Sequence, residues 1–332
     1  MDALLFESID RFVAGCSTPA VVREAEHGQG AASLWADVES SGYAELLVDE
    51  AAGGAGLGLR EAFALWLACG RHALPVPLGH TAWVRAVLPL AGVEAPKGPL
   101  TLAAQCSRDA QGGWSCQNVP FGMVADWVLV SDAQGAALLP VAGGERRPNG
   151  VHGSLQAHIR WPAQPAGALP LPGPCDLLHA GALMTAALMA GALQRVLEAT
   201  VSYANDRAQF GKSIGKFQAV QQQLSVMAEQ VFAARMAAEI GCAGDGIVPH
   251  PLRAAVAKAR ASEAAEKVVA IAHAVHGAIG VTAEYDLQLH TRRLQEWRGD
   301  FGSQGYWHLQ LGRALVASPE PTLPFMLGEL LP

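Results

Sequence analysis

The sequence predicts a mainly α-helical fold with a small β-domain in its middle. Residues 1–95 and 169–332 carry apolar side chains at helical spacing. Residues 96–168 replace that periodicity with glycine, proline and short runs of β-forming residues. We therefore expect three parts: an N-terminal helical domain (1–95), a shortened middle β-domain (96–168) and a C-terminal antiparallel bundle of the four-helix type (169–332).

The N-terminal part reads as several helices. Apolar residues from Leu4 to Val13 recur at helical spacing, and a later apolar stretch ends at Gly42, a residue type that often stops a helix. Further helices are expected at Arg60–Cys69 and at about Thr81–Leu90. The glycine cluster at 53–58 lacks the G-x-G-x-x-G spacing between a strand and a helix, so it does not indicate a dinucleotide loop.

The middle and C-terminal parts differ in the length of their elements. Five short strands are expected, within residues 100–104, 113–117, 127–130, 136–140 and 155–160. Long helices then follow at Leu177–Asp206, Gln218–Cys242, Pro251–Val275, Glu284–Arg298 and Ser303–Ala317. Three prolines, at 319, 321 and 324, are expected to end regular helix near the C-terminus.

Composition excludes several classes of protein. A formal charge of -7 without a basic cluster argues against nucleic acid as a partner. Only 16% of residues are charged, which fits a chain that buries surface against other subunits. The first residues, beginning at Met1, lack a basic segment before an apolar one, and the apolar run Ala180–Leu193 is shorter than a membrane span, so we expect a cytoplasmic protein without a membrane span.

Six cysteines are scattered along the chain without CxxC spacing. In a cytosolic protein such cysteines are most simply buried free thiols, and we expect no zinc or other metal site.

The turn at residues 207–218 is the strongest candidate for chemistry. Arg207 closes one long helix and Gln218 opens the next, with two glycines between them. Unpaired N–H groups at a helix start attract phosphates, and the planar donors of arginine suit a pyrophosphate. The structural alternative is a simple helix hairpin with a solvated arginine.

Several motifs resemble the acyl-CoA dehydrogenase family. They are Arg-Ala-Gln-Phe-Gly at 207–211, Phe-Gln-Ala-Val-Gln at 217–221, the alanine-rich helix through Arg235, His-Gly-Ala-Ile-Gly at 276–280, and the acidic and basic residues between Glu284 and Arg293. The resemblance covers most of the chain. It implies an FAD-dependent α,β-dehydrogenation of an acyl-CoA thioester, in a dimer or tetramer that is homo- or hetero-oligomeric, with an electron-transfer flavoprotein as electron acceptor.

The resemblance also implies cofactor-binding residues. Arg207, Gln209, Phe210 and Gln218 would reach a flavin held mainly by the neighbouring subunit. The second contact set, Gln-x-x-Gly-Gly in the family, falls on residues 274–278, where the glutamine and the second glycine are alanines. The set thus becomes His276, Gly277 and Ala278, and it is altered. His273 and His276 read as capping or packing residues.

The catalytic base departs from the family pattern as well. Counting from Arg292 and Arg293 places Phe301 at one usual glutamate position, and Gly181 at the alternative position. Asp300, one place earlier, is the nearby acid in register, with Glu296 a turn back. Asp300 is either the base or the N-cap of the helix from Ser303 onward, and we favour the cap.

Three hypotheses follow from the resemblance. The leading one makes this chain the smaller, partly degenerate subunit of a bacterial hetero-oligomeric acyl-CoA dehydrogenase of the steroid side-chain type, in which two subunits share one flavin and the partner brings the base. The second is a homo-oligomeric flavin dehydrogenase or oxidase that uses Asp300 as base. The third is a flavin-free structural subunit. The acyl pocket is expected along Leu183–Leu188 and the Glu50–Leu57 loop.

Overall fold

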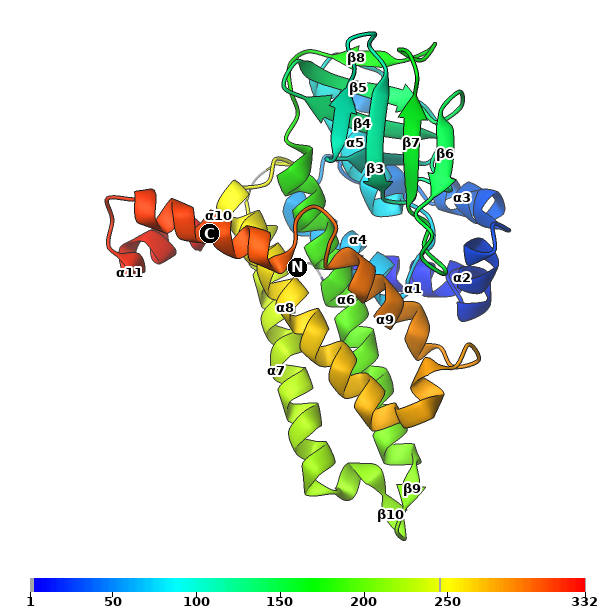
Figure 1. The fold of residues 1–332 in the computed structure, drawn as a ribbon, viewed down its shortest axis with the longest axis vertical. Helices are drawn as coiled ribbons and strands as arrows, with labels where there is room; N and C mark the ends of the chain where they lie inside the picture. Colours follow the sequence, from blue (N-terminus) through cyan, green and yellow to red (C-terminus); the bar gives the residue numbers. More distant parts are fainter. Residues whose placement is uncertain (1–2, 245, 332) are drawn as a thin grey trace.

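The computed structural model describes residues 3–244 and 246–331, so Met1 and Asp2 of the N-terminal segment considered above lie outside the described residues. Long helices form the body of the molecule (Figure 1), with the β-domain at one end and the small β9–β10 hairpin at the other. The predicted fold class, mainly α with a small β-domain, is confirmed.

The N-terminal helices lie beside the bundle and below the β-domain (Figure 1). They are α1 (Ala3–Cys16), α2 (Pro19–Glu26), α3 (Ala31–Ser40), α4 (Leu59–Arg71) and α5 (Leu78–Leu90), with the short turns η1 (Tyr43–Glu45) and η2 (Glu50–Ala52) between α3 and α4. Gly42 takes a φ of 77° just after α3, which agrees with its predicted role as a stop. The last of these helices starts at Leu78, three residues earlier than predicted, directly after Pro77.

The middle domain consists of two four-stranded sheets, ordered β1-β4-β5-β8 and β2-β3-β7-β6. The strands are β1 (Leu100–Ala103), β2 (Cys106–Arg108), β3 (Trp114–Val119), β4 (Trp127–Asp132), β5 (Gly135–Pro140), β6 (Glu145–Pro148), β7 (Ala157–Trp161) and β8 (Leu169–Leu171). All five predicted strands are present, but β2, β6 and β8 were missed. These three are short strands at the sheet edges, so they bury too few side chains to leave a pattern.

The C-terminal part is a bundle of long helices. It comprises α6 (Leu177–Asp206), β9 (Ala208–Gln209), β10 (Lys212–Ser213), η3 (Ile214–Lys216), α7 (Gln218–Gly241), α8 (Pro251–His276), η4 (Gly277–Val281), α9 (Leu287–Trp297) and α10 (Gln304–Ala317). Beyond it, α11 (Thr322–Phe325) and η5 (Met326–Leu330) correct the prediction that prolines end regular helix there. Pro321 is the N-cap of α11 and Pro324 lies in its first turn, where a missing N–H costs nothing.

The N-terminal helices and the bundle share one hydrophobic core. Helices α4 and α6 touch backbone to backbone, because a Cβ at Gly70 would lie 1.9 Å from the Leu188 carbonyl oxygen and one at Gly191 would lie 2.0 Å from that of Leu67. Only glycine permits this approach. The resulting core runs without interruption from α1 to α10.

Two segments are long and apolar enough to cross a membrane by length and composition alone, namely Leu177–Asp206 and Pro251–Val281. In the first, 83% of the most apolar stretch is buried inside the protein, and in the second 39% is. Core helices of a bundle pass the same test, so the expectation of no membrane span stays a prediction.

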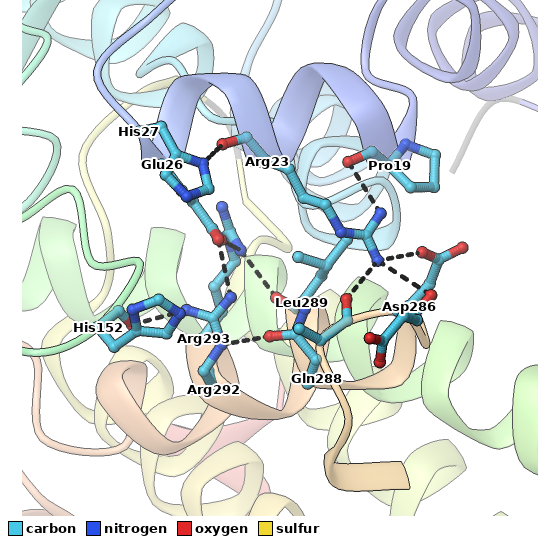
Figure 2. Close-up of polar contacts among 12 residues, drawn as sticks. Pro19, Arg23, Glu26, His27, His152, Asp286, Gln288, Leu289, Arg292 and Arg293 are labelled. Carbon is cyan, nitrogen blue, oxygen red and sulfur yellow. Dashed lines mark hydrogen bonds and ion pairs between the residues drawn. The ribbon is translucent and has the colours of Figure 1, made fainter. Parts of the chain in front are cut away.

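A cluster of charged residues joins the three parts of the chain (Figure 2). The Glu26 carboxylate at the end of α2 accepts from Arg292 at 2.8 Å and from Arg293 at 2.7 Å, both on α9. Arg292 also donates to the backbone oxygen of His152 in the β-domain at 2.6 Å. The side chains of Glu26 and Arg293 are only 5% and 10% exposed. A separate, more exposed pair links Arg23 with Asp286 at 2.8 Å.

Candidate functional site

A cavity of about 900 Å³ lies between the β-domain and helices α8 and α9. Side-chain amides dominate its polar lining: Gln105, Gln117, Asn118, Asn149, Gln156, Gln288 and Gln295. Its charged and titratable lining residues are His152, His273, Arg292, Glu296 and Asp300. The cavity is the largest among the principal pockets of the described residues, so it is the first candidate for the reaction site.

The structure places Asp300 in the wall of this cavity, which corrects the favoured prediction that it caps a helix. The N-cap of α10 is Ser303, whose hydroxyl accepts from the Tyr306 N–H at 3.3 Å. The Asp300 carboxylate instead accepts from Gln156 Nε2 at 2.7 Å on each of its oxygens. Gln156 is held in turn by Asn149, whose amide donates to Gln156 Oε1 at 3.1 Å. Asp300 is therefore a positioned carboxylate that faces an open volume.

The surroundings of Asp300 make it a better base than a free aspartate. Burial raises the pKa of Asp300 well above its ordinary value, and the nearby Glu296 carboxylate raises it further. Gln156 and the Lys258 ammonium act in the opposite direction. Burial also raises the pKa of Glu296, against hydrogen bonds from Ser154 and Asn149. A carboxylate whose pKa is moved toward neutrality takes up a proton more readily.

The two usual base positions of the family contact one another here. A Cβ at Gly181 would lie 2.2 Å from Cδ1 of Phe301, so the aromatic ring fills the space beside this glycine. Phe301 takes a φ of 50° and is 6% exposed. The His80 ring meets it nearly edge-on at 6.5 Å between centroids. With an aromatic ring at one position and a glycine at the other, neither supplies a carboxylate.

Sequence reasoning missed two residues at this site, Gln156 and Lys258. Lys258 is fully buried on α8, and its ammonium donates to Ser262 Oγ, the Arg298 carbonyl oxygen and the Gly302 carbonyl oxygen at 3.1, 3.1 and 2.9 Å. A signal for it exists in the sequence, because one lysine interrupts the alanines that form the buried face of this helix. No comparable signal marks Gln156, which reaches the site through the tertiary fold.

The turn at 207–218 contains the β9–β10 hairpin and lies at the far end of the bundle from the β-domain (Figure 1). Arg207, Gln209, Phe210 and Gln218 are all exposed, and none lines the cavity. Phe210 is 91% exposed. Within the part of the chain that the structure describes, the Arg207 side chain has no hydrogen bond or ion pair. These residues are thus free to meet another molecule, but the fold does not bring them to Asp300.

The second predicted set of flavin contacts, His276, Gly277 and Ala278, contains one buried and two exposed residues. His276 is buried, stacks on Tyr203 at 4.4 Å between ring centroids, and donates from Nδ1 to the Ala272 carbonyl oxygen, as a packing residue would. Gly277 and Ala278 are exposed. Gly277 takes a φ of 64°, and no atom lies within 4 Å of the place where its Cβ would be. His273, by contrast, lines the cavity and bonds Thr291 Oγ1 at 3.1 Å.

Two smaller predictions concern the acyl group and the cysteines. The expected acyl pocket at Leu183–Leu188 and Glu50–Leu57 does not coincide with the cavity, and Leu188 lines only a void of about 10 Å³, so this place for the acyl group stays a prediction. The six cysteines are unpaired, but Cys16, Cys106 and Cys175 are half-buried rather than buried. Among the described residues, no group of three His, Cys, Asp or Glu side chains is placed to hold a metal ion.

Comparison with known proteins agrees with this geometry. Residues 175–314 match the family model described as the C-terminal domain of acyl-CoA dehydrogenase. The chain is 32% identical over 312 residues to acyl-CoA dehydrogenase IpdE2 of Mycobacterium tuberculosis, covering 87% of this chain and 89% of that protein.

Two solved structures are similar over nearly the whole chain. The ChsE4-ChsE5 complex from Mycobacterium tuberculosis has a TM-score of 0.80 at 25% identity, covering 95% of this chain and 97% of that one. The G363A variant of the Tcur3481-Tcur3483 steroid ACAD has a TM-score of 0.79 at 27% identity, with 94% and 96% covered. Sequence and structure together place this chain in the acyl-CoA dehydrogenase family, whose members are oxidoreductases that act on acyl-CoA.

Proposed function

We propose that this chain is one subunit of an FAD-dependent acyl-CoA dehydrogenase in which Asp300 serves as the catalytic base. The observation that carries the proposal is the Asp300 carboxylate in the wall of the 900 Å³ cavity, held by Gln156 rather than by a helix end. Phe301 and Gly181 supply no carboxylate at the family's usual positions, and Asp300 is the acid directly before one of them in the sequence. This modifies the hypothesis that a partner must bring the base.

In the proposed reaction, Asp300 removes the proton from the carbon next to the thioester carbonyl of an acyl-CoA. A bound flavin would supply the acceptor for the hydride that leaves the neighbouring carbon, so that the product would be an enoyl-CoA. Raising the pKa of Asp300 toward neutrality increases the driving force for this proton transfer, while the two bonds from Gln156 fix where the carboxylate lies.

We propose that the flavin is shared with another subunit. The exposed, unpaired guanidinium of Arg207 and the start of the 24-residue helix α7 fit a diphosphate, and the open space at Gly277 permits close approach of a dinucleotide. These residues do not line this chain's own cavity. They would therefore serve a flavin site completed by a partner, as the two-component names of the similar structures also suggest for a hetero-oligomer. An electron-transfer flavoprotein is the electron acceptor we expect.

The test uses the chain purified alone and co-expressed with the products of neighbouring genes. Flavin content is measured by absorbance, and acyl-CoA-dependent reduction of an artificial electron acceptor is followed. One flavin per pair and turnover only in the pair would support a shared site. Full flavin on the lone chain would favour the homo-oligomeric enzyme, and no flavin in either sample would leave a structural subunit.

The role of Asp300 is tested in whichever assembly turns over. Asp300→Asn should lower kcat/KM by a factor of about 10²–10⁴, the usual contribution of a general base. Asp37→Asn, a matched change of an exposed aspartate on α3, should leave it unchanged. Wild-type turnover in Asp300→Asn would remove this residue from the mechanism.

A further inference from the structure

Lys258 is a buried cation that the proposed reaction has not yet used. It lies in the middle of α8 with no exposed surface, among small side chains such as Ala254, Ala257 and Ala261. Burial of an unpaired ammonium is costly, and here burial lowers the pKa of Lys258. An apolar residue at this position would leave Ser262 and two backbone carbonyl oxygens without the donor that they have now, so the contacts of Lys258 explain its presence.

The contacts of Lys258 converge on the turn that carries Asp300. An ammonium has three donors. One goes to Ser262 Oγ on the same helix, and the other two go to the carbonyl oxygens of Arg298 and Gly302. These two carbonyl groups stand on either side of Asp300 in the chain, so one cation ties both ends of the segment.

The tied segment has an unusual backbone. Phe301 and Gly302 take φ values of 50° and 98°, in the left-handed region. For a residue with a side chain, such as phenylalanine, this conformation costs on the order of 1–2 kcal/mol. The turn would relax if its ends were free, and Asp300, directly before Phe301, would then move relative to Gln156 and the cavity.

The charges around Asp300 also point to Lys258. Glu296 on α9 opposes ionisation of Asp300, and Lys258 on α8 favours it. The other charged or titratable groups nearby are Arg298, whose guanidinium pairs with Glu266, and the cavity residues Arg292, His152 and His273. Arg292 is already bonded to Glu26 and His152, and Lys258 is the cation whose charge favours the ionised Asp300 carboxylate.

We infer that Lys258 is a positioning residue for Asp300: its ammonium holds the 298–302 turn through two carbonyl groups and stabilises the ionised carboxylate by its charge. The inference rests on the proposed role of Asp300 as base. It assigns two separable effects to one side chain: geometry through the hydrogen bonds, and charge through the ammonium.

Lys258→Gln separates the two effects, because an amide can still donate to both carbonyl groups but carries no charge. Without the cation the pKa of Asp300 rises, so the ascending limb of the pH profile of kcat/KM should move up by about one pH unit, with a plateau close to that of the wild type. Lys258→Arg keeps the charge and should keep the limb in place. Lys267→Gln, the same change at an exposed lysine on α8, is the matched control.

Lys258→Met removes both effects, and its unbranched apolar side chain suits the buried site if the glutamine variant does not fold. Lys258→Met should shift the ascending limb of the kcat/KM profile to higher pH and should also lower the plateau. The inference would be overturned if that limb moved by less than about 0.2 pH units in a folded Gln or Met variant, which is about the error of such a profile. A loss of activity that is equal at every pH would also overturn it.

Failure of this inference is distinguishable from failure of the proposed function. Asp300→Asn is measured in the same assembly. If Asp300→Asn loses turnover but Lys258→Gln keeps the ascending limb of the kcat/KM profile in place, only the role of Lys258 is refuted. Wild-type turnover in Asp300→Asn refutes the base itself, whatever the lysine variants do.

Discussion

Glu26 offers the clearest test of what holds the three parts of the chain together. Its carboxylate accepts from both Arg292 and Arg293, and its side chain is only 5% exposed (Figure 2). Burial already lowers the pKa of Arg293, and Glu26 has the largest effect in the opposite direction. Removal of the carboxylate would leave an arginine that is 10% exposed without its bonded counter-charge, and with only the more distant effect of Glu296 to oppose burial.

The expected size of the effect follows from this burial. Loss of one partner of a buried ion pair costs about 3–5 kcal/mol, and Glu26→Gln should lie at the lower end because glutamine can still accept a hydrogen bond. The 332 residues imply an unfolding entropy of about 0.7 kcal/mol/K, at about 2.1 cal/mol/K per residue. We therefore expect Tm to fall by about 4 °C.

Thermal unfolding followed by circular dichroism measures this change, with Asp286→Asn as the control. Asp286 pairs with Arg23 across a surface where the side chains are 50% and 30% exposed. Such a pair contributes less than about 1 kcal/mol, so Tm should fall by about 1 °C or less and the difference should vanish in high salt. If Glu26→Gln lowers Tm no more than Asp286→Asn does, the cluster does not hold the parts together.

Three further predictions concern the cofactor, the packing and the pH range. Arg207→Ala should lower the flavin content of the assembled complex, measured by absorbance after gel filtration. Arg313→Ala, which changes another exposed arginine, should leave the flavin content unchanged. Equal flavin content in the two variants would favour the hypothesis of a structural subunit. Gly181→Ala should lower the free energy of unfolding by about 1–3 kcal/mol, because the new Cβ would meet the Phe301 ring. The loss should be smaller when Phe301 is also replaced by alanine. Purely additive effects of the two substitutions would contradict this explanation. Burial lowers the pKa of His290 from 6.5 to about 4, so its contribution to stability, on the order of 3 kcal/mol, is present above pH 6.5 and lost as pH falls through 4. His290→Gln should flatten that fall in denaturant titrations at several pH values, and an unchanged slope would contradict the assignment.

Sequence patterns predicted the long helices of the bundle well because each helix is a local structure, whereas the short helix α2 was not predicted. The predicted range Leu177–Asp206 coincides with α6, and α7 and α8 end within one residue of their predicted bounds. The strands were harder, since β6 is fully exposed and shows no alternation of burial. Parallel pairing of β1 with β4 joins distant residues, and no local signal announces it.

The candidate site was predicted less well for a physical reason. Asp300 lies three residues before Ser303, the N-cap of α10, and aspartate and serine are both good N-cap residues. Which of the two caps α10 depends on the left-handed turn at Phe301 and Gly302 and on Gln156, 144 residues away in sequence. The cavity has the same origin, since segments from the β-domain, α8 and α9 meet only in the folded chain.

The glycine contact between α4 and α6 limits how this protein can be divided. A fragment that began at residue 169 would keep every residue of the bundle helices, yet it would expose to water the side of α6 that Gly70 and its neighbours cover. Such a fragment would expose an apolar surface and would aggregate unless another helix covered that surface in place of α4. Experiments on flavin retention or pairing therefore need the whole chain. An insertion into the exposed β9–β10 hairpin should destabilise the fold less than an insertion at the contact between α4 and α6.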